Sequence, residues 1–226
     1  VIIQNGNAGA GNYHWAYKWR VETENLYFQI YGSGENYNWI SVTFPHIELN
    51  QWHHITTTFD GSMMVGYLDG TPIDTMYNTL SINYAENSID IGSMATSGEY
   101  FNGFIDDIII YNDATNINQI DNILINDIDF SDNDLIGYYR FNAGSGDILY
   151  DHSGNGNHGT INGATWVENI YGCTDDLACN YNSEANWNDD SCDYSCHDNG
   201  DYSLSFDGVD DWSQSYISSF NSIEDF

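Results

Sequence analysis

Short apolar runs follow one another through residues 1–112, and Gly, Asn and Ser separate them. The runs are VIIQ, YHWAYKWR, NLYFQIY, NWISVTF, WHHITTTF, MMVGYLDG, SIDIG and YFNGFIDDIIIY. Most alternate between apolar and polar residues, which is typical of strands with one buried face. The pattern predicts an antiparallel β-sandwich. A helix is expected only at residues 115–125, where Ile117, Ile120 and Leu124 share one helical face.

The pattern divides the rest of the chain into four further segments. Residues 127–134 are an acidic linker, and residues 135–171 return to strands around LIGYYRF and GTINGATWV. Residues 172–199 carry the four Cys among many Asp and Asn, with few aliphatic side chains. Strand-like alternation resumes within residues 200–226, in SLSFDGVDDW. The sandwich itself is predicted over residues 1–126.

The charge balance excludes two classes of partner. Only 3 basic residues oppose 34 acidic ones, which gives a formal net charge of −31. Nucleic acid binding needs clustered Lys and Arg, and an anionic membrane surface would repel the chain. No apolar run approaches the ~18 residues of a membrane helix, so membrane insertion is not expected. Because Val1 lies inside a strand-like pattern, any signal peptide is expected to lie outside this fragment.

Two long segments resemble a known family. QWHHITTTFDGSMMVGYLDG and NGFIDDIIIYNDATNINQI are similar to the second half of a laminin-G-like domain, a concanavalin A-like jelly roll. GCTDDLACNYNSEANWNDDSC resembles a short Cys/Asp module repeated in large secreted proteins of bacteria. The resemblance implies an all-β fold: an antiparallel β-sandwich with a small, loop-rich, disulfide-stapled insert.

The family's opening strands are not found ahead of Val1. Residues 135–167 and 202–212 both resemble that opening. One interpretation is a tandem array cut out of phase, in which residues 200–226 begin the next sandwich. A second is circular permutation, in which residues 202–212 complete the first sandwich. A third makes LIGYYRF an extra strand of that sandwich.

The four cysteines follow the spacing C-x5-C-x12-C-x3-C. Zinc sites favour tighter pairs, whereas a small exported module with few aliphatic residues needs disulfides for stability. Four cysteines allow three pairings. The resemblance to the Cys/Asp module implies Cys173–Cys192, which leaves Cys179–Cys196.

Three groups of oxygen-bearing side chains are candidate Ca²⁺ ligands, because Ca²⁺ takes 6–8 oxygen ligands. In the Cys-rich module they are Asn182, Glu184, Asn186, Asn188 and Asp190, and the alternative is a turn in which Asx side chains bond their own backbone. Related sandwiches hold Ca²⁺ at the sheet rim, which implies Asp207, Asp210 and Asp211 as one site and Asp106 with Asp107 as another. The alternative for Asp106 and Asp107 is a purely structural role.

Catalytic signatures are few. The sequence contains no G-x-S-x-G or H-E-x-x-H motif, and GNGNHG at residues 154–159 precedes a strand-like segment, which favours a turn over a dinucleotide site. Glu86 and Asp90 have the spacing of the carboxylates of jelly-roll glycosidases, without the acid that those enzymes carry between them. The protein is therefore expected not to be an enzyme.

Aromatic residues beside Gly/Asn turns are candidate ligand contacts, because a sugar ring can stack on them. They are Tyr13, Tyr37 and Tyr100, whereas Trp15 and Trp39 are expected to fill the sandwich interior. Together these features favour a non-catalytic, extracellular, calcium-supported adhesion segment of a large bacterial cell-surface protein. Its partner would be a glycan, a cell-surface protein or neighbouring copies of itself. The alternatives are a structural repeat of a surface filament or sheath, and a carbohydrate-recognition module of a secreted enzyme.

Overall fold

The computed structural model describes most of the chain. The described residues are 2–9, 12–22, 25–32, 38–44, 47, 51–79, 88–94, 98–114, 128–197, 200, 204–206, 209–210 and 212–213. Within them the only helical element is the 3-10 turn η1 (Ser195–His197). The helix predicted at residues 115–125 lies outside the described residues. No described helix is long and apolar enough to span a membrane.

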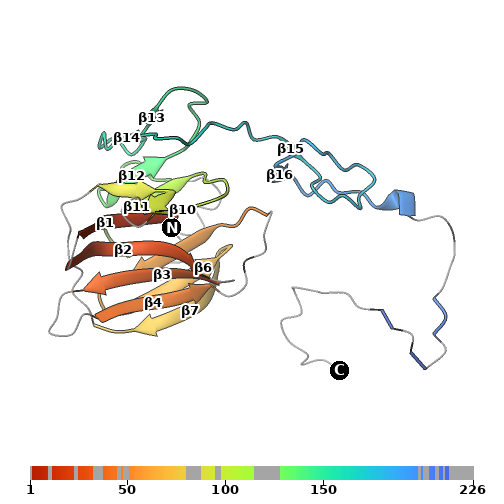
Figure 1. Ribbon diagram of the computed structural model, residues 1–226, viewed down its shortest axis with the longest axis horizontal. Coiled ribbons are helices and arrows are strands. Elements are labelled where there is room, and N and C mark those ends of the chain that lie inside the picture. The colour runs from red at the N-terminus through yellow and green to blue at the C-terminus, as the bar shows by residue number, and fades with distance from the viewer. Residues whose placement is uncertain are drawn as a thin grey trace.

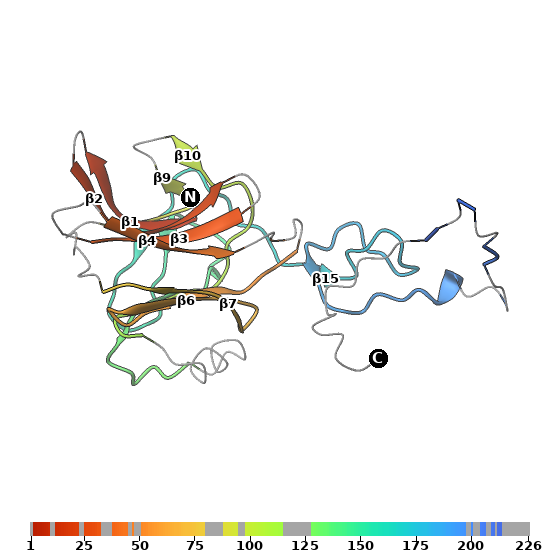
Figure 2. The same ribbon diagram turned by 90° about the horizontal axis from the view of Figure 1, so that it is seen from below.

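Two antiparallel sheets form the sandwich (Figure 1). The five-stranded sheet has the order β4-β3-β2-β1-β8. Its strands are β1 (Ile3–Gly9), β2 (Asn12–Glu22), β3 (Asn25–Gly32), β4 (Asn38–Phe44) and β8 (Ile89–Ile91). The three-stranded sheet consists of β5 (Ile55–Phe59), β6 (Met63–Leu68) and β7 (Thr71–Tyr77) in that order. Figure 2 shows the two sheets lying one above the other. The predicted sandwich is confirmed.

The hydrophobic core fills the space between the two sheets. Trp19 packs on Phe28 and Phe44, with ring centroids 4.9 and 5.0 Å apart. Met64 of β6 is a fully buried member of this core and comes from the three-stranded sheet. The other buried members are Ile3, Leu26, Ile30, Ile40 and Val42. Because successive strand residues face opposite sides, this set defines the inner face of the five-stranded sheet.

The hairpin between β6 and β7 turns at Asp69-Gly70. Both residues have a positive φ, 49° and 80°, as a two-residue type I′ turn requires. The Asp69 carboxylate accepts hydrogen bonds from the His54 amide at 2.7 Å and pairs with His53 Nδ1 at 3.1 Å. The YLDG segment therefore both makes the turn and ties it to the start of β5.

β7 was not among the strands expected from the sequence. Its Pro72 and Asp74 are poor strand formers, and a register shift next to Gly66 accommodates them. β7 is an edge strand of its sheet, where a missing amide donor is tolerated. The Asp74 carboxylate accepts the Thr43 amide of β4 at 2.8 Å, so it caps one donor on the neighbouring sheet's edge.

Four further short strands form two antiparallel pairs. β9 (Ser93–Met94) pairs with β10 (Glu99–Tyr100), and β11 (Ile108–Tyr111) pairs with β12 (Leu135–Tyr139). The run YFNGFIDDIIIY was expected to be one strand, but it is interrupted at residues 101–107, where Asp107 has a φ of 47°. β11 and β12 form a two-stranded sheet of their own, so the interpretation of LIGYYRF as an extra strand of the sandwich stays a prediction.

The rest of the chain forms small two-stranded pieces. β13 (Ile148–Leu149) pairs with β14 (Gly159–Thr160), and β15 (Tyr171–Gly172) pairs in parallel with β16 (Trp187–Asn188) inside the Cys-rich module. The described part of residues 202–213 lies in no strand, and Leu204, Phe206, Val209 and Trp212 are exposed. Whether that segment begins another sandwich or completes this one stays a prediction, as does the division into domains.

Candidate ligand-binding surface and metal sites

The predicted ligand contacts differ in where the structure places them. Tyr100, in β10, exposes 71% of its surface. Tyr37 lies outside the described residues, and Tyr13 is described only as a backbone position of β2. The expectation that Trp39 fills the interior is wrong, because Trp39 exposes 57% of its surface. Ile40 and Val42 face the core, so alternation along β4 turns Trp39 outward.

A row of polar residues crosses the outer face of the five-stranded sheet. The strand registers pair Ser41 with Gln29, Gln29 with Lys18, Lys18 with Gln4, and Gln4 with Asp90. Each strand contributes one residue. We call these five positions the polar row. Gln4 Nε2 donates to Asp90 Oδ2 at 3.1 Å.

Two members of the polar row are buried although they lie opposite the core. Gln4 exposes 2% and Gln29 exposes 4% of its surface. The Oε1 atoms of both have no hydrogen-bond partner. Sequence reasoning missed this row. Alternation assigns each residue to a face, but only the strand registers align the five into one line.

Asp106 and Asp107 lie in the loop that leads into β11. Asp106 Oδ1 accepts the Asp107 amide at 3.0 Å, and its Oδ2 accepts Asn169 Nδ2 at 3.1 Å. Partial burial, followed by the charge of Asp106, raises the pKa of Asp107, while Arg140 and a hydrogen bond with Tyr138 oppose that rise. Two adjacent carboxylates supply part of the 6–8 oxygens that Ca²⁺ takes. The pair also fits the structural alternative, since Asp106 joins two loops.

Both disulfides are present in the Cys-rich module, residues 172–197 of the described chain. Cys173 bonds to Cys192 with an S–S distance of 2.05 Å, and Cys179 bonds to Cys196. These are the pairs that the resemblance implied. Cys173 is buried, with 1% of its surface exposed, whereas Cys179 and Cys196 are exposed.

The Asn side chains of the module bond to nearby backbone. Asn182 Oδ1 accepts the Glu184 amide at 3.1 Å, and Asn188 Oδ1 accepts the Asp190 amide at 3.3 Å. Asn186 Oδ1 accepts the Ile170 amide at 2.8 Å. Asn182 and Asn188 therefore form the Asx turns of the alternative, whereas Asn186 bonds to a more distant amide. The Ca²⁺ prediction for this group stays a prediction.

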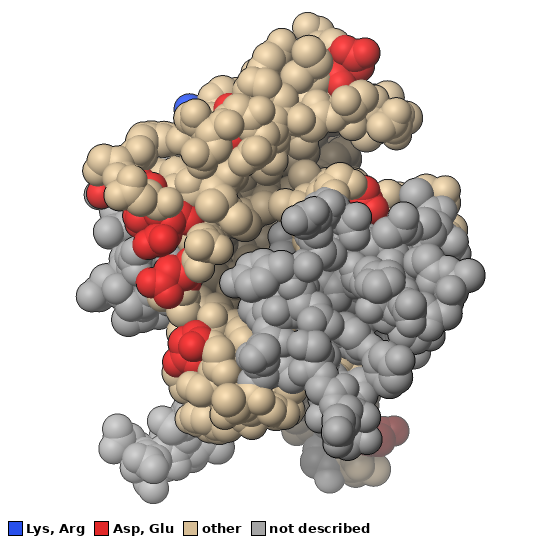
Figure 3. Space-filling view, turned by 90° about the vertical axis from the view of Figure 1, so that its left-hand side faces the viewer, with Lys and Arg blue, Asp and Glu red and all other residues tan. Residues whose placement is uncertain are grey.

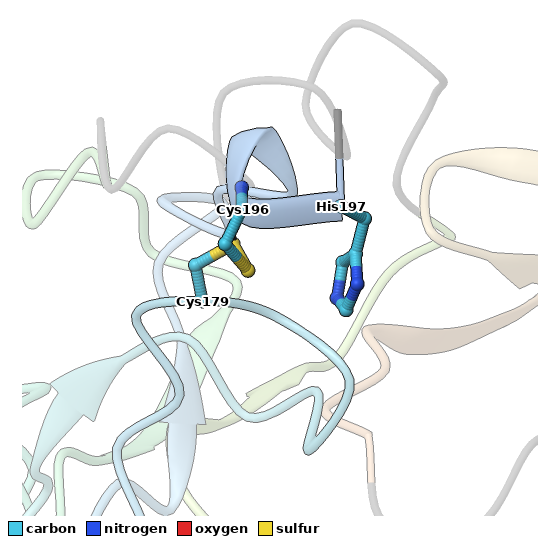
Figure 4. Close-up of side chains that lie close together, drawn as sticks. All are labelled: Cys179, Cys196 and His197. Atoms are coloured by element: carbon cyan, nitrogen blue, oxygen red, sulfur yellow. A yellow bond between two sulfur atoms is a disulfide. The ribbon is translucent and has the colours of Figure 1, made fainter. Parts of the chain in front are cut away.

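One cluster in the described residues has three potential metal ligands within 4.8 Å of one another, namely Cys179, Cys196 and His197. Figure 4 shows the two sulfurs joined to each other, with the His197 ring to one side. His197 Nε2 lies 2.7 Å from the Leu177 carbonyl oxygen. A disulfide leaves no thiolate to bind a metal, so the oxidised cluster does not fit a metal centre.

The third predicted calcium site cannot be assembled from the described residues. Asp210 is exposed. Asp207 and Asp211 lie outside the described residues. The Ca²⁺ prediction there stays a prediction.

Asp151 organises the loop that contains GNGNHG. Its carboxylate accepts three backbone amides, from Tyr138 at 3.0 Å, Ser153 at 2.9 Å and Asn157 at 2.9 Å. Burial of the carboxyl would raise its pKa, but these hydrogen bonds outweigh burial and lower the pKa to about 2. Positive φ at Gly154 and Gly156 lets the loop wrap around the carboxylate, and β14 follows it. The segment is a turn, as predicted.

An aromatic cluster joins the Cys-rich module to the sandwich. Trp52, just before β5, stacks on Trp187 of the module with ring centroids 4.5 Å apart. Trp52 Nε1 also donates to the Asn186 carbonyl at 3.1 Å. Phe104 flanks Trp52 at 6.3 Å, and Tyr171 flanks Trp187 at 5.7 Å. We call this set the aromatic clasp.

The surface charge is mostly negative. Figure 3 shows Asp and Glu in red over one face of the molecule, with little blue beside them. With a formal net charge of −31, the field around the chain attracts cations and repels anions.

The comparisons with known proteins agree with this architecture. The Concanavalin A-like lectin/glucanases superfamily, of the Laminin_G_3 type, matches residues 1–121. A search of curated proteins finds no match. A solved structure from Bacteroides ovatus, that of a supposed carbohydrate binding protein, is similar with a TM-score of 0.52 and 17% identity over 73% of this chain and 50% of that one.

A second similar structure is that of residues 221–444 of an S-layer domain-containing protein from Clostridium thermocellum. It matches at 19% identity over 54% of this chain and 60% of that one, with a TM-score of 0.27. This chain thus spans half to three fifths of the length of these two chains. The family match covers more than half of the sequence, and the chain belongs to the Concanavalin A-like lectin/glucanases superfamily.

Proposed function

We propose that this chain is a non-catalytic, extracellular binding segment that adheres to carbohydrate. One observation carries the proposal: large aromatic side chains are exposed on many parts of the surface. Besides Trp39 and Tyr100 they include Tyr77, Phe104, Tyr150, Tyr171, Tyr181 and Tyr194. Exposed aromatic rings combined with Asn and Asp side chains suit sugars, which offer apolar ring faces and hydroxyl groups.

Two features support an extracellular location. The Cys-rich module holds two disulfides, and disulfides persist in oxidising compartments outside the cytoplasm. The excess of carboxylates suits a medium rich in salt and divalent cations.

The absence of hydrolysis is part of the proposal. A retaining glycosidase needs two carboxyl groups about 5–5.5 Å apart. Asp90 is the carboxylate in the polar row. The residues two positions before and after it, Ser88 and Gly92, carry no second carboxyl group. Calcium support is also part of the proposal: Ca²⁺ bound by Asp106 and Asp107 would stabilise the loop at residues 101–107.

A glycan array tests the proposal. The oxidised chain is applied in calcium and again in excess chelator, and bound oligosaccharides are checked for cleavage by mass spectrometry. We expect saccharide binding, weaker in chelator, with every oligosaccharide intact. If no saccharide binds and the chain instead assembles into ordered polymers, the structural-repeat alternative replaces adhesion. Cleaved oligosaccharides would show that the chain is an enzyme.

A further inference from the structure

We propose that Cys179, Cys196 and His197 form a Zn²⁺ site once a small neutral thiol has reduced the disulfide between the two cysteines. Cys196 and His197 lie in the 3-10 turn η1, and Cys179 is bonded to that turn. The ligand atoms of the three residues lie within 4.8 Å of one another (Figure 4). Zinc binding here does not depend on the proposed recognition of carbohydrate.

The Cys179–Cys196 disulfide is more accessible to a reductant than the Cys173–Cys192 disulfide. Cys179 and Cys196 are both exposed, whereas Cys173 exposes only 1% of its surface. Reduction by a thiol requires the thiolate to reach a sulfur atom, so access decides which disulfide opens first. Cys173–Cys192 therefore stays closed and continues to cross-link the module while Cys179–Cys196 opens.

A backbone amide favours one direction of this exchange. The Cys196 amide donates a hydrogen bond to Cys179 Sγ at 2.9 Å. Because this bond stabilises negative charge on Cys179 Sγ, Cys179 is the better leaving group. A thiolate RS⁻ attacks Cys196 Sγ, forms a mixed disulfide with it and releases the Cys179 thiolate. A second RS⁻ attacks the sulfur of the bound R group and releases the Cys196 thiolate. The two thiols are oxidised to RSSR, their protons pass to the solvent, and two electrons reduce the protein disulfide.

His197 has the hydrogen bond that metal-binding histidines make. Its Nε2 lies 2.7 Å from the Leu177 carbonyl oxygen. A carbonyl oxygen only accepts, so Nε2 carries the proton in this contact and Nδ1 of the neutral ring keeps a lone pair. A histidine that binds a metal usually donates its other ring N–H to a carbonyl or a carboxylate in the same way. The Leu177 carbonyl therefore fixes the ring and leaves Nδ1 for the metal.

Two thiolates and one imidazole favour Zn²⁺ among the common divalent cations. Sulfur and nitrogen ligands suit Zn²⁺, whereas Ca²⁺ and Mg²⁺ take oxygen ligands. Zn–S bonds of about 2.3 Å in a tetrahedral site hold two sulfurs roughly 3.8 Å apart, a separation that the sulfurs can reach only after the disulfide is cleaved. Three protein ligands leave the fourth position to water. The formal net charge of −31 attracts the cation and favours an uncharged thiol over an anionic one.

Limited reduction followed by metal titration tests the site. The oxidised chain is treated with the neutral thiol mercaptoethanol and freed of it in the absence of oxygen. One portion is alkylated and mapped by mass spectrometry, and we expect labels on Cys179 and Cys196 while Cys173–Cys192 stays intact. A second portion is titrated with Zn²⁺ and, separately, with Co²⁺. It should bind a single Zn²⁺ ion, and with Co²⁺ it should show the absorption of tetrahedral, sulfur-bound cobalt, which the oxidised chain should lack.

Two variants test the assigned ligands against a matched control. His197→Ala should open at the same disulfide but bind Zn²⁺ about tenfold or more weakly, because it lacks the third ligand. His152→Ala, at an exposed histidine outside the module, is the control and should keep its affinity for Zn²⁺ within about twofold. A variant with both Cys179→Ser and Cys196→Ser should show no cobalt–sulfur absorption after the same treatment.

Several results would overturn the proposal. They are labelling of Cys173 or Cys192 as fast as of the exposed pair, no cobalt–sulfur absorption in the reduced chain, and unchanged Zn²⁺ affinity in His197→Ala. Hydrogen exchange checks that the module stays folded after limited reduction, and we expect β15 and β16 to exchange more slowly than in a chain with both disulfides reduced. Equally fast exchange would also overturn the proposal, since the metal would then bind an unfolded segment.

Discussion

At the residue scale, single polar groups fix the loops that follow the sandwich. Asp151 exposes 7% of its surface and gathers three amides from two parts of the chain. The Asp69 carboxylate accepts the His54 amide and pairs with the His53 ring, which fixes the residues just before β5. Such residues were hard to recognise from the sequence, because 34 acidic residues offer many similar candidates and only the folded backbone brings amide donors to particular ones.

Asp151→Asn should lower the free energy of unfolding by on the order of 1–2 kcal/mol at pH 7. The folded pKa of Asp151, about 2, is below its ordinary value, so its stabilising effect is complete above about pH 4 and is lost as the pH falls towards 2. The difference between native and variant should therefore shrink over that range. Urea unfolding at several pH values measures it, with Asp147→Asn, at an exposed position of the same segment, as control. An equal difference at pH 7 and pH 2 would contradict this account.

At the scale of the elements, the positions of the sandwich strands were largely predictable from the sequence. The core strands β2, β3, β4 and β6 follow the alternation of apolar and polar residues, and turn residues mark their ends. β7 was missed because Pro72 and Asp74 hide its pattern, and the break at residues 101–107 depends on tertiary packing. Pairing between strands, and with it the polar row, depends on register, which no local pattern specifies.

Gly66 in β6 shows how closely the two sheets approach. A Cβ atom there would lie 2.9 Å from Phe44 Cζ and 3.2 Å from Val42 Cγ2. Gly66→Ala should therefore destabilise the protein by about 1–3 kcal/mol through overpacking. Thermal unfolding measures this. Gly159→Ala, whose new atom would be in ordinary contact at 3.4 Å from Leu149 Cβ, is the control and should change stability by less than about 1 kcal/mol. An equal loss of stability in the two variants would contradict close packing of Gly66 against Phe44 and Val42.

The Cys-rich module depends on its disulfides, because few of its side chains are buried. Replacing both Cys173 and Cys192 by Ser should destabilise the module by about 2–4 kcal/mol. Hydrogen exchange measured by mass spectrometry should show faster exchange in residues 170–197 and unchanged exchange in β2 to β4. Protection lost equally in both regions would mean that the module and the sandwich unfold as one unit.

At the scale of the whole molecule, the aromatic clasp decides how the module sits on the sandwich. Trp52 and Trp187 belong to different parts of the chain, 135 positions apart (187 − 52), and no sequence pattern linked them. Their stacking and the Trp52–Asn186 hydrogen bond hold the two parts together, and the Asn169–Asp106 hydrogen bond fixes the segment just before the module. A fixed module would present its exposed tyrosines in a constant direction relative to the polar row.

Trp52→Ala should release the module from the sandwich. The lost ring contact and hydrogen bond together amount to about 1–3 kcal/mol of docking energy. Small-angle scattering should show a larger radius of gyration, and circular dichroism should lose the signal of the coupled indole rings. Tyr77→Ala, at an exposed aromatic residue outside the clasp, should change neither. An unchanged radius of gyration in Trp52→Ala would show that the clasp does not hold the module.

The exposed aromatic side chains carry the proposed recognition of carbohydrate, and a crystal structure with an oligosaccharide selected on the array is its most direct test. We predict sugar density with a ring stacked on an exposed aromatic side chain such as Trp39 or Tyr100. Density that touches no exposed aromatic ring would contradict the proposal.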